Sequence, residues 1–151
     1  MDYETVDLDE KKIAGLCVRT NNLSTDVNRD IGGLWEKFLS GGVYSAIAGK
    51  TGAKALGVYT DYAGDEKGDY NFLTACEVSK TDSIPHGVVI KTIPAGKYAK
   101  FTVKGNMVKS VVNFWTELWS MDLPRSFICD FEEYQNADMQ NSEIHIYIGL
   151  K

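Results

Sequence analysis

The chain has 151 residues, of which 44% are hydrophobic and 25% are charged, a composition typical of one globular domain with its own core. The net charge is −5, and the 16 lysines and arginines are scattered along the chain, so they form no basic stripe that could follow a phosphate backbone. We therefore predict a single domain over residues 1–151 that makes no direct contact with nucleic acid.

The N-terminal stretch MDYETVDLDEKK lacks the apolar segment of a secretory signal. No apolar run approaches the roughly 18 residues that a membrane helix needs. Cys17, Cys76 and Cys129 are far apart in apolar, strand-like sequence, which favours buried reduced thiols over a disulfide framework. These features predict a cytoplasmic protein that does not associate with a membrane.

The first half of the chain predicts a strand, a helix and a hairpin. Residues 11–19 have the pattern of a strand, and the polar residues 24–26 can cap the helix that follows. The apolar residues of that helix recur at helical spacing and end at Gly41-Gly42; they are Ile31, Leu34, Trp35 and Phe38. Residues 55–62 and 70–78 are predicted as strands joined by the turn AGDEKGD.

The second half repeats this order after a crossing segment, 79–95, that contains two prolines. A strand is predicted at 97–104, a helix that opens near Asn106 and ends at Pro124, and strands at 127–134 and 143–149. The apolar face of this helix carries Val108, Val111, Val112, Trp115, Leu118 and Trp119.

The predicted fold class is therefore α+β, with a β-α-β-β unit in each half, roughly 1–80 and 95–151. We expect pseudo-two-fold symmetry, antiparallel sheets with the helices on one side, and a ligand cleft between the halves. The repeat is based on the order of elements, because the sequences of the two halves are only faintly similar.

Aromatic and polar side chains alternate with apolar ones in the last two predicted strands. We expect the isoleucines of strand 143–149, and the apolar row of strand 127–134 that contains Phe131, to face the helices. Four other residues of these strands then share the opposite face. That face is too aromatic for solvent and too polar for a core, as in a ligand cleft. Its residues are Glu132, Tyr134, His145 and Tyr147.

Aligning the segment ALGVY (55–59) of the first half with DFEEY (130–134) of the second half adds Tyr59 and Phe72 to the cleft. A bulge in the first strand would exchange Tyr59 for Tyr62. Trp35 and Trp115 lie on the helix faces and could fill the core or reach the edge of the cleft. The alternative for all these rings is ordinary packing, and for the glutamate a solvated position. If instead this carboxylate is buried among rings, the cost of removing its charge from water must be offset by protonation, by hydrogen bonds from tyrosines or by a cationic ligand.

Three stretches carry a family resemblance: IPHGVVIKTIPAGKYAKFTVKG (84–105), FWTELWSMDLPRS (114–126) and DFEEYQNADMQNSEIHIYIGLK (130–151). GLWEKF (33–38) and GVYTDY (57–62) extend it to nearly the whole chain. The chain resembles the GyrI-like (AraC-type effector-binding) domain family, in particular its integron-associated effector-binding branch.

The resemblance implies a duplicated β-α-β-β fold with an aromatic pocket, which multidrug-sensing regulators use to bind lipophilic cations. A glutamate in a Phe-Glu-x-Tyr pattern contacts the ligand charge in that family, and here the pattern assigns this role to Glu132, with Tyr147 as a ring partner. Two features depart from the family: there is no helix-turn-helix segment, and His145 stands where many relatives have a glutamate, so the charge there depends on pH.

The resulting hypothesis is a stand-alone protein that binds a lipophilic, cationic small molecule as a sensor or sequestering agent, with a regulator as a further protein partner. One alternative is a hydrolase of reactive electrophiles, with Glu132 as general base, because some GyrI-like proteins are described as opening such compounds. The other is a protein-partner module. The sequence favours binding over catalysis.

No cofactor or metal is predicted. YSAIAGKT (44–51) lacks the first glycine of a phosphate-binding loop. The three cysteines and the two histidines, His86 and His145, have no metal-ligand spacing. No G-x-S-x-G nucleophile pattern occurs either.

Overall fold

The computed structural model describes residues 1–151 and contains the predicted β-α-β-β order twice, as β2-α1-β3-β4 and β6-α3-β7-β8. The α+β class is confirmed. In chain order the elements are β1 (Glu4–Leu8), β2 (Lys11–Asn21), α1 (Val27–Leu39), α2 (Val43–Ala46), β3 (Leu56–Thr60), β4 (Asp69–Glu77), β5 (Val89–Ile93), β6 (Gly96–Gly105), α3 (Met107–Leu118), β7 (Arg125–Tyr134) and β8 (Ser142–Leu150).

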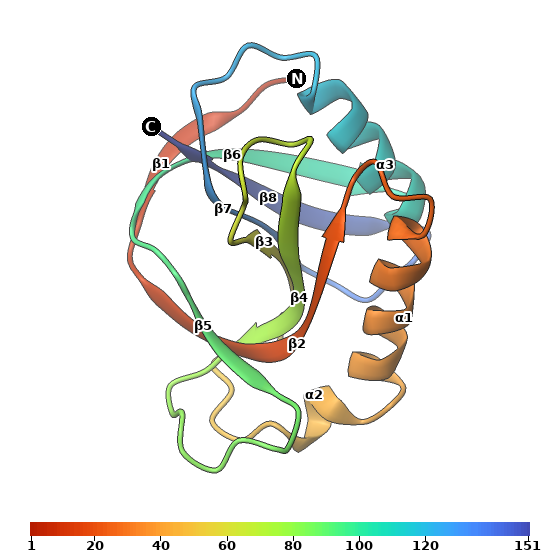
Figure 1. Cartoon of the computed structure of the whole chain (residues 1–151), viewed down its shortest axis with the longest axis vertical. Coiled ribbons are helices and arrows are strands. Elements are labelled where there is room, and N and C mark those ends of the chain that lie inside the picture. The colour runs from red at the N-terminus through yellow and green to blue at the C-terminus, as the bar shows by residue number, and fades with distance from the viewer.

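All eight strands form one antiparallel sheet in the order β1-β6-β8-β7-β3-β4-β2-β5. The two halves meet where β3 pairs with β7, and we call this pair the seam. Gly57 lies opposite Glu132 at the seam, and Val58 lies opposite Phe131. The halves are thus joined by backbone hydrogen bonds into a continuous sheet, and α1 and α3 lie along one side of it (Figure 1).

The strand register shows that α1 and α3 cover the same face of the sheet. One row of side chains crosses five strands, from β8 to β2, and consists of Ile146, Glu132, Gly57, Thr74 and Leu16. Ile146 belongs to the core under α3, and Leu16 belongs to the core under α1. The predicted placement of the helices on one side is therefore confirmed.

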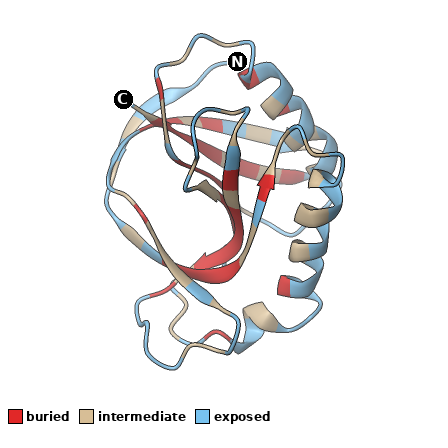
Figure 2. Ribbon diagram, viewed as in Figure 1, coloured by how far each residue is buried: buried red, intermediate tan, exposed pale blue.

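The other face of the sheet, which we call the inner face, buries a third core. Its members come from seven strands, β2 to β8: Ile13, Leu56, Val58, Leu73, Ala75, Ile93, Tyr98, Cys129, Phe131 and Tyr147. Figure 2 shows the resulting pattern, with buried strands at the centre and the outer sides of the helices exposed. The sheet thus buries both of its faces.

Two edge strands, β1 and β5, were not predicted. The connected strands β1 and β2 run antiparallel to β5 and β6 in one unbroken register, with Leu8 opposite Gly96 and Lys11 opposite Ile93. Pro94 lies in the break between β5 and β6, where its missing N–H costs no ladder hydrogen bond. This long ribbon passes from one half of the sheet to the other and curls the sheet round the inner core (Figure 1).

The helix ends agree partly with the prediction. The helix α3 begins at Met107, close to the predicted start near Asn106, and the Asn106 side chain caps it by accepting a hydrogen bond from the Lys109 N–H at 3.1 Å. Asp26 precedes α1 but makes no capping hydrogen bond, and α3 ends at Leu118, before Pro124. The three cysteines are free thiols, two of them buried. None of the helices combines the length and the apolar character that spanning a membrane would take.

Candidate functional site

Glu132 lies on the helix-covered face of the sheet, which corrects the predicted orientation. In β7 and β8, Glu132 pairs with Ile146 and Tyr134 pairs with Ile144, whereas Phe131 pairs with Tyr147. The alternation within each strand was assigned correctly, but the two strands were matched in the wrong phase. A slip of one residue between strands exchanges the faces, and the pattern of a single strand does not fix that choice.

Tyr147 and His145 consequently lie on the inner face and do not line a cleft with Glu132. Tyr147 stacks on Phe131, with ring centroids 4.6 Å apart and an interplanar angle of 17°. The Nε2 atom of His145 lies 2.8 Å from Oε2 of Glu143. The prediction that these two residues share a face with Glu132 is wrong.

Three aromatic side chains donate hydrogen bonds to the Glu132 carboxylate. The Tyr59 hydroxyl and the Trp115 indole N–H donate to Oε2 at 2.9 and 2.8 Å, and the Tyr134 hydroxyl donates to Oε1 at 2.8 Å. These donors come from β3, α3 and β7. The carboxylate therefore ties both halves of the sheet to α3, and Glu132 is only 1% exposed.

The same donors belong to a continuous group of rings. Tyr59 packs 4.9 Å from Trp115 and 5.0 Å from Phe72, measured between ring centroids. Trp35 packs 5.3 Å from Tyr134 and 6.4 Å from Phe72. Trp35 and Trp115 each stand ninth in their helix, so the repeat brings one indole from each half to the seam.

Gly57 is a site residue that the sequence interpretation missed. A Cβ atom added there would meet Oε1 of Glu132 at 2.8 Å and Cζ2 of Trp35 at 3.3 Å. Its φ does not fall in the left-handed region, so the position needs glycine for space and not for backbone conformation. A glycine inside the strand sequence LGVYT was the available signal, because glycine in a strand often marks a close approach.

Burial is the main influence on the charges of the site. It raises the pKa of the Glu132 carboxyl, and the hydrogen bonds from Trp115, Tyr134 and Tyr59 partly oppose this rise. Burial and the nearby carboxylate raise the pKa of Tyr59 and Tyr134 well above the ordinary tyrosine value, so both stay protonated as donors. None of the ion pairs in the structure involves Glu132.

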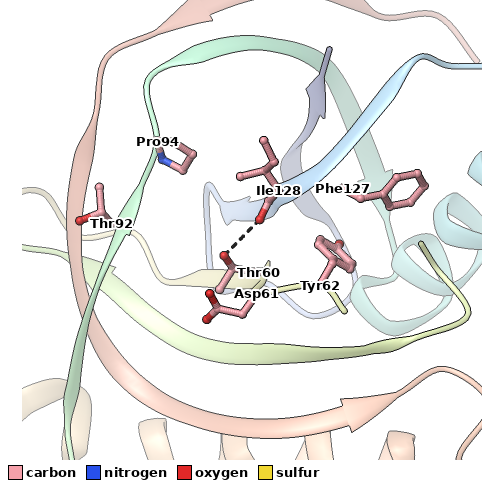
Figure 3. Close-up of a pocket in the computed structure, with 7 residues that line it drawn as sticks. All are labelled: Thr60, Asp61, Tyr62, Thr92, Pro94, Phe127 and Ile128. Carbon is pink, nitrogen blue, oxygen red and sulfur yellow. Dashed lines mark hydrogen bonds between the residues drawn. The ribbon is translucent and has the colours of Figure 1, made fainter. Parts of the chain in front are cut away.

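Tyr62, the alternative to Tyr59, serves a different carboxylate. Its hydroxyl donates to Oδ2 of Asp130 at 2.6 Å, beside Nη2 of Arg125 at 2.8 Å. A hollow of about 440 Å³ adjoins this pair, where β3 and β7 face β5 (Figure 3). Glu132 is not among its lining residues, so this hollow is separate from the ring group.

Comparison with known proteins identifies the family. Residues 4–150 match the sequence model of Cass2, the integron-associated effector binding proteins. The chain belongs to this family. This confirms the resemblance drawn from the sequence and its effector-binding class.

The relatives of this effector-binding protein include regulators. It is 31% identical over 151 residues to the putative transcriptional regulator protein YobU of Bacillus subtilis, covering 95% of this chain and 94% of that protein. It is 30% identical over 130 residues to the transcriptional regulator BrlR of Pseudomonas aeruginosa, covering 80% of this chain. The match spans 46% of BrlR, about half of that protein's length.

Two solved structures share the fold over nearly their whole length. The integron cassette protein VCH_CASS2 from the mobile metagenome of Vibrio cholerae has a TM-score of 0.78 and 28% identity, covering 99% of this chain and 95% of that chain. SAV2435, solved bound to tetraphenylphosphonium, has a TM-score of 0.82 and 20% identity, covering 100% of this chain and 94% of that chain. These matches confirm the α+β fold.

Proposed function

We propose that the protein binds a lipophilic cation between α1, α3 and the seam, with Glu132 neutralising the ligand charge. The observation that carries this proposal is a carboxylate that is 1% exposed, surrounded by aromatic rings, and without an ionic partner in the chain. As an effector-binding protein it would act as a sensor or a sequestering agent.

The energetics favour a cationic guest. Removing a carboxylate from water is costly, and three neutral donors compensate this cost only in part. A cation placed over the faces of Trp115 and Tyr59 would gain on the order of 0.5 to 2 kcal/mol per good contact. The carboxylate adds a Coulomb attraction that is stronger in this water-poor setting than at an exposed surface.

Binding requires a ring to move. The aromatic side chains contact one another and cover the carboxylate. Trp35, Tyr59, Trp115 and Tyr134 are only partly buried, whereas Phe72 is fully buried. Rotation of Trp115 would remove one N–H donor from Glu132 and let the positive charge of the ligand replace it.

The test compares a cation with a neutral molecule of similar shape. SAV2435 shares the fold and was solved with tetraphenylphosphonium, so this cation is the probe, and triphenylphosphine oxide is the neutral counterpart. In calorimetric titrations, Glu132→Gln should weaken tetraphenylphosphonium binding at least tenfold, equivalent to about 1.4 kcal/mol. It should change binding of the neutral compound by less than about threefold.

Glu133→Gln is the matched control, because Glu133 is the next residue of β7 and its side chain lies on the inner face, opposite His145. This variant should bind both compounds as the wild type does. Equal losses for both compounds in Glu132→Gln, or no binding of tetraphenylphosphonium by the wild type, would contradict the proposal.

A further inference from the structure

The row of side chains across the sheet places a second polar group close to the carboxylate. Glu132, Gly57 and Thr74 are direct neighbours on β7, β3 and β4. Adjacent strands are about 4.8 Å apart, so the backbones of Glu132 and Thr74 are separated by about 10 Å. Gly57 has no side chain, and the strip of sheet between the two polar residues is therefore bare backbone.

Thr74 is 0% exposed, and its Oγ1 atom has no hydrogen-bond partner. Buried hydroxyls are nearly always hydrogen-bonded, and an unpaired one is unfavourable. A valine has the same shape and would fill this strand position without that penalty. Thr74 points to the helix-covered face, as do Phe72 and Cys76, the alternate residues of β4.

Oε1 of Glu132 and two aromatic rings cover this backbone. The position of a Cβ on Gly57 lies 3.3 Å from Cζ2 of Trp35 and 3.4 Å from Cε1 of Phe72. The Trp35 indole thus rests on the backbone of β3. An aromatic ring of a ligand that displaced this indole would lie against Gly57, with one end at Glu132 and the other at Thr74.

We infer that Gly57 and Thr74 form a subsite of the proposed cation site, which accepts an aromatic ring bearing a hydrogen-bonding group on the side away from the positive charge. Gly57 provides the floor, and the Thr74 hydroxyl pairs with a hydroxyl or amine of the ligand. The ligand is therefore an aromatic cation whose polar substituent lies about two strand spacings, roughly 10 Å, from the carboxylate. This inference rests on the proposed function.

The test uses two cations that differ by one hydroxyl group, tetraphenylphosphonium and (4-hydroxyphenyl)triphenylphosphonium. Wild-type protein should bind the hydroxylated cation about 3- to 10-fold more tightly, the gain expected for one neutral hydrogen bond. Thr74→Val should lose this preference and bind the two cations with equal affinity. Thr74→Ser, which keeps the hydroxyl, should retain the preference.

Gly57→Ala tests the floor, because its Cβ would displace the Glu132 carboxylate or the Trp35 ring. It should weaken both cations at least tenfold, whereas Gly64→Ala, which has nothing within 4 Å of its added Cβ, should weaken neither. Thermal unfolding reports whether each variant is folded. If Gly57→Ala is unfolded, the Thr74 comparison decides alone, since Thr74→Val removes only an unpaired hydroxyl.

The two proposals fail in different ways. If the wild type does not distinguish the two cations, or Thr74→Val keeps the preference, the subsite is wrong while the Glu132-dependent binding of tetraphenylphosphonium stands. If the wild type binds neither cation, the proposed function is wrong and the subsite with it.

Discussion

Trp115→Phe should destabilise the protein by an amount that grows with pH. The change removes the indole N–H that lies 2.8 Å from Oε2 of Glu132 and leaves a smaller ring in its place. A hydrogen bond to a charged group contributes about 1.5 to 3 kcal/mol, and a bond between neutral groups about 1 kcal/mol. The part of the loss that depends on ionisation of Glu132 is therefore up to about 2 kcal/mol.

The sign follows from the raised pKa of Glu132 in the folded protein. Between the ordinary glutamate pKa and this raised value, the folded state binds more protons than the unfolded state, so stability falls as pH rises through that window. Removing a hydrogen bond that lowers the pKa widens the window to higher pH. The free energy of unfolding of the variant should thus drop below that of the wild type by more at pH 8 than at pH 5.

Urea unfolding followed by circular dichroism at the two pH values measures this difference. Trp119→Phe is the control, because Trp119 directly follows α3 and is 48% exposed, and it should change stability by less than about 0.5 kcal/mol at either pH. In a Glu132→Gln background the pH-dependent part should vanish. A loss of the same size at pH 5 and pH 8 would refute the reasoning and leave only the packing of the smaller ring.

Two further predictions concern the carboxylates. The charge of tetraphenylphosphonium does not titrate and the tyrosines that face Glu132 stay protonated, so the affinity for this cation should rise by up to tenfold per pH unit until Glu132 is ionised and then level off. Titrations from pH 5 to 8 should show this slope in the wild type and none in Glu132→Gln. A flat wild-type profile would contradict the raised pKa of Glu132. Asp130→Ala should cost about 3 to 5 kcal/mol in urea unfolding, because it leaves Arg125, which is 8% exposed, without its anion; a loss below about 1 kcal/mol would show that this pair does not hold the start of β7.

The sequence predicted most elements of the fold because their signals are local. The period of the apolar residues located α1 and α3, and alternation located β2, β3, β4, β6, β7 and β8. It missed β1 and β5, which are short edge strands. These two strands are defined by their pairing with β6 and β2 across the chain, and the pattern of a short segment alone contains no such information.

The site was predicted in composition and misplaced in space. Glu132, Tyr59, Tyr134, Phe72 and Trp115 meet as a group, because each lies where the strand and helix periods put it. The register between β7 and β8 also shifts, at a bulge between Arg125 and Asp130 that includes Phe127 at a positive φ of 54°. An aromatic residue in that conformation is rare, and the sequence gives no sign of it.

The repeat explains why the carboxylate lies at the seam and why only one is present. The seam is the position that both helices can reach, and each helix brings its ninth residue, a tryptophan, to it. A second carboxylate at Gly57, directly opposite Glu132, would put two like charges in one buried site and raise the pKa of at least one of them strongly. With glycine there, one half supplies the charge and the other supplies the space for it, an arrangement suited to a ligand with a single positive charge. A dication of the same ring framework should gain no affinity over the monocation, because its second charge would find only neutral donors.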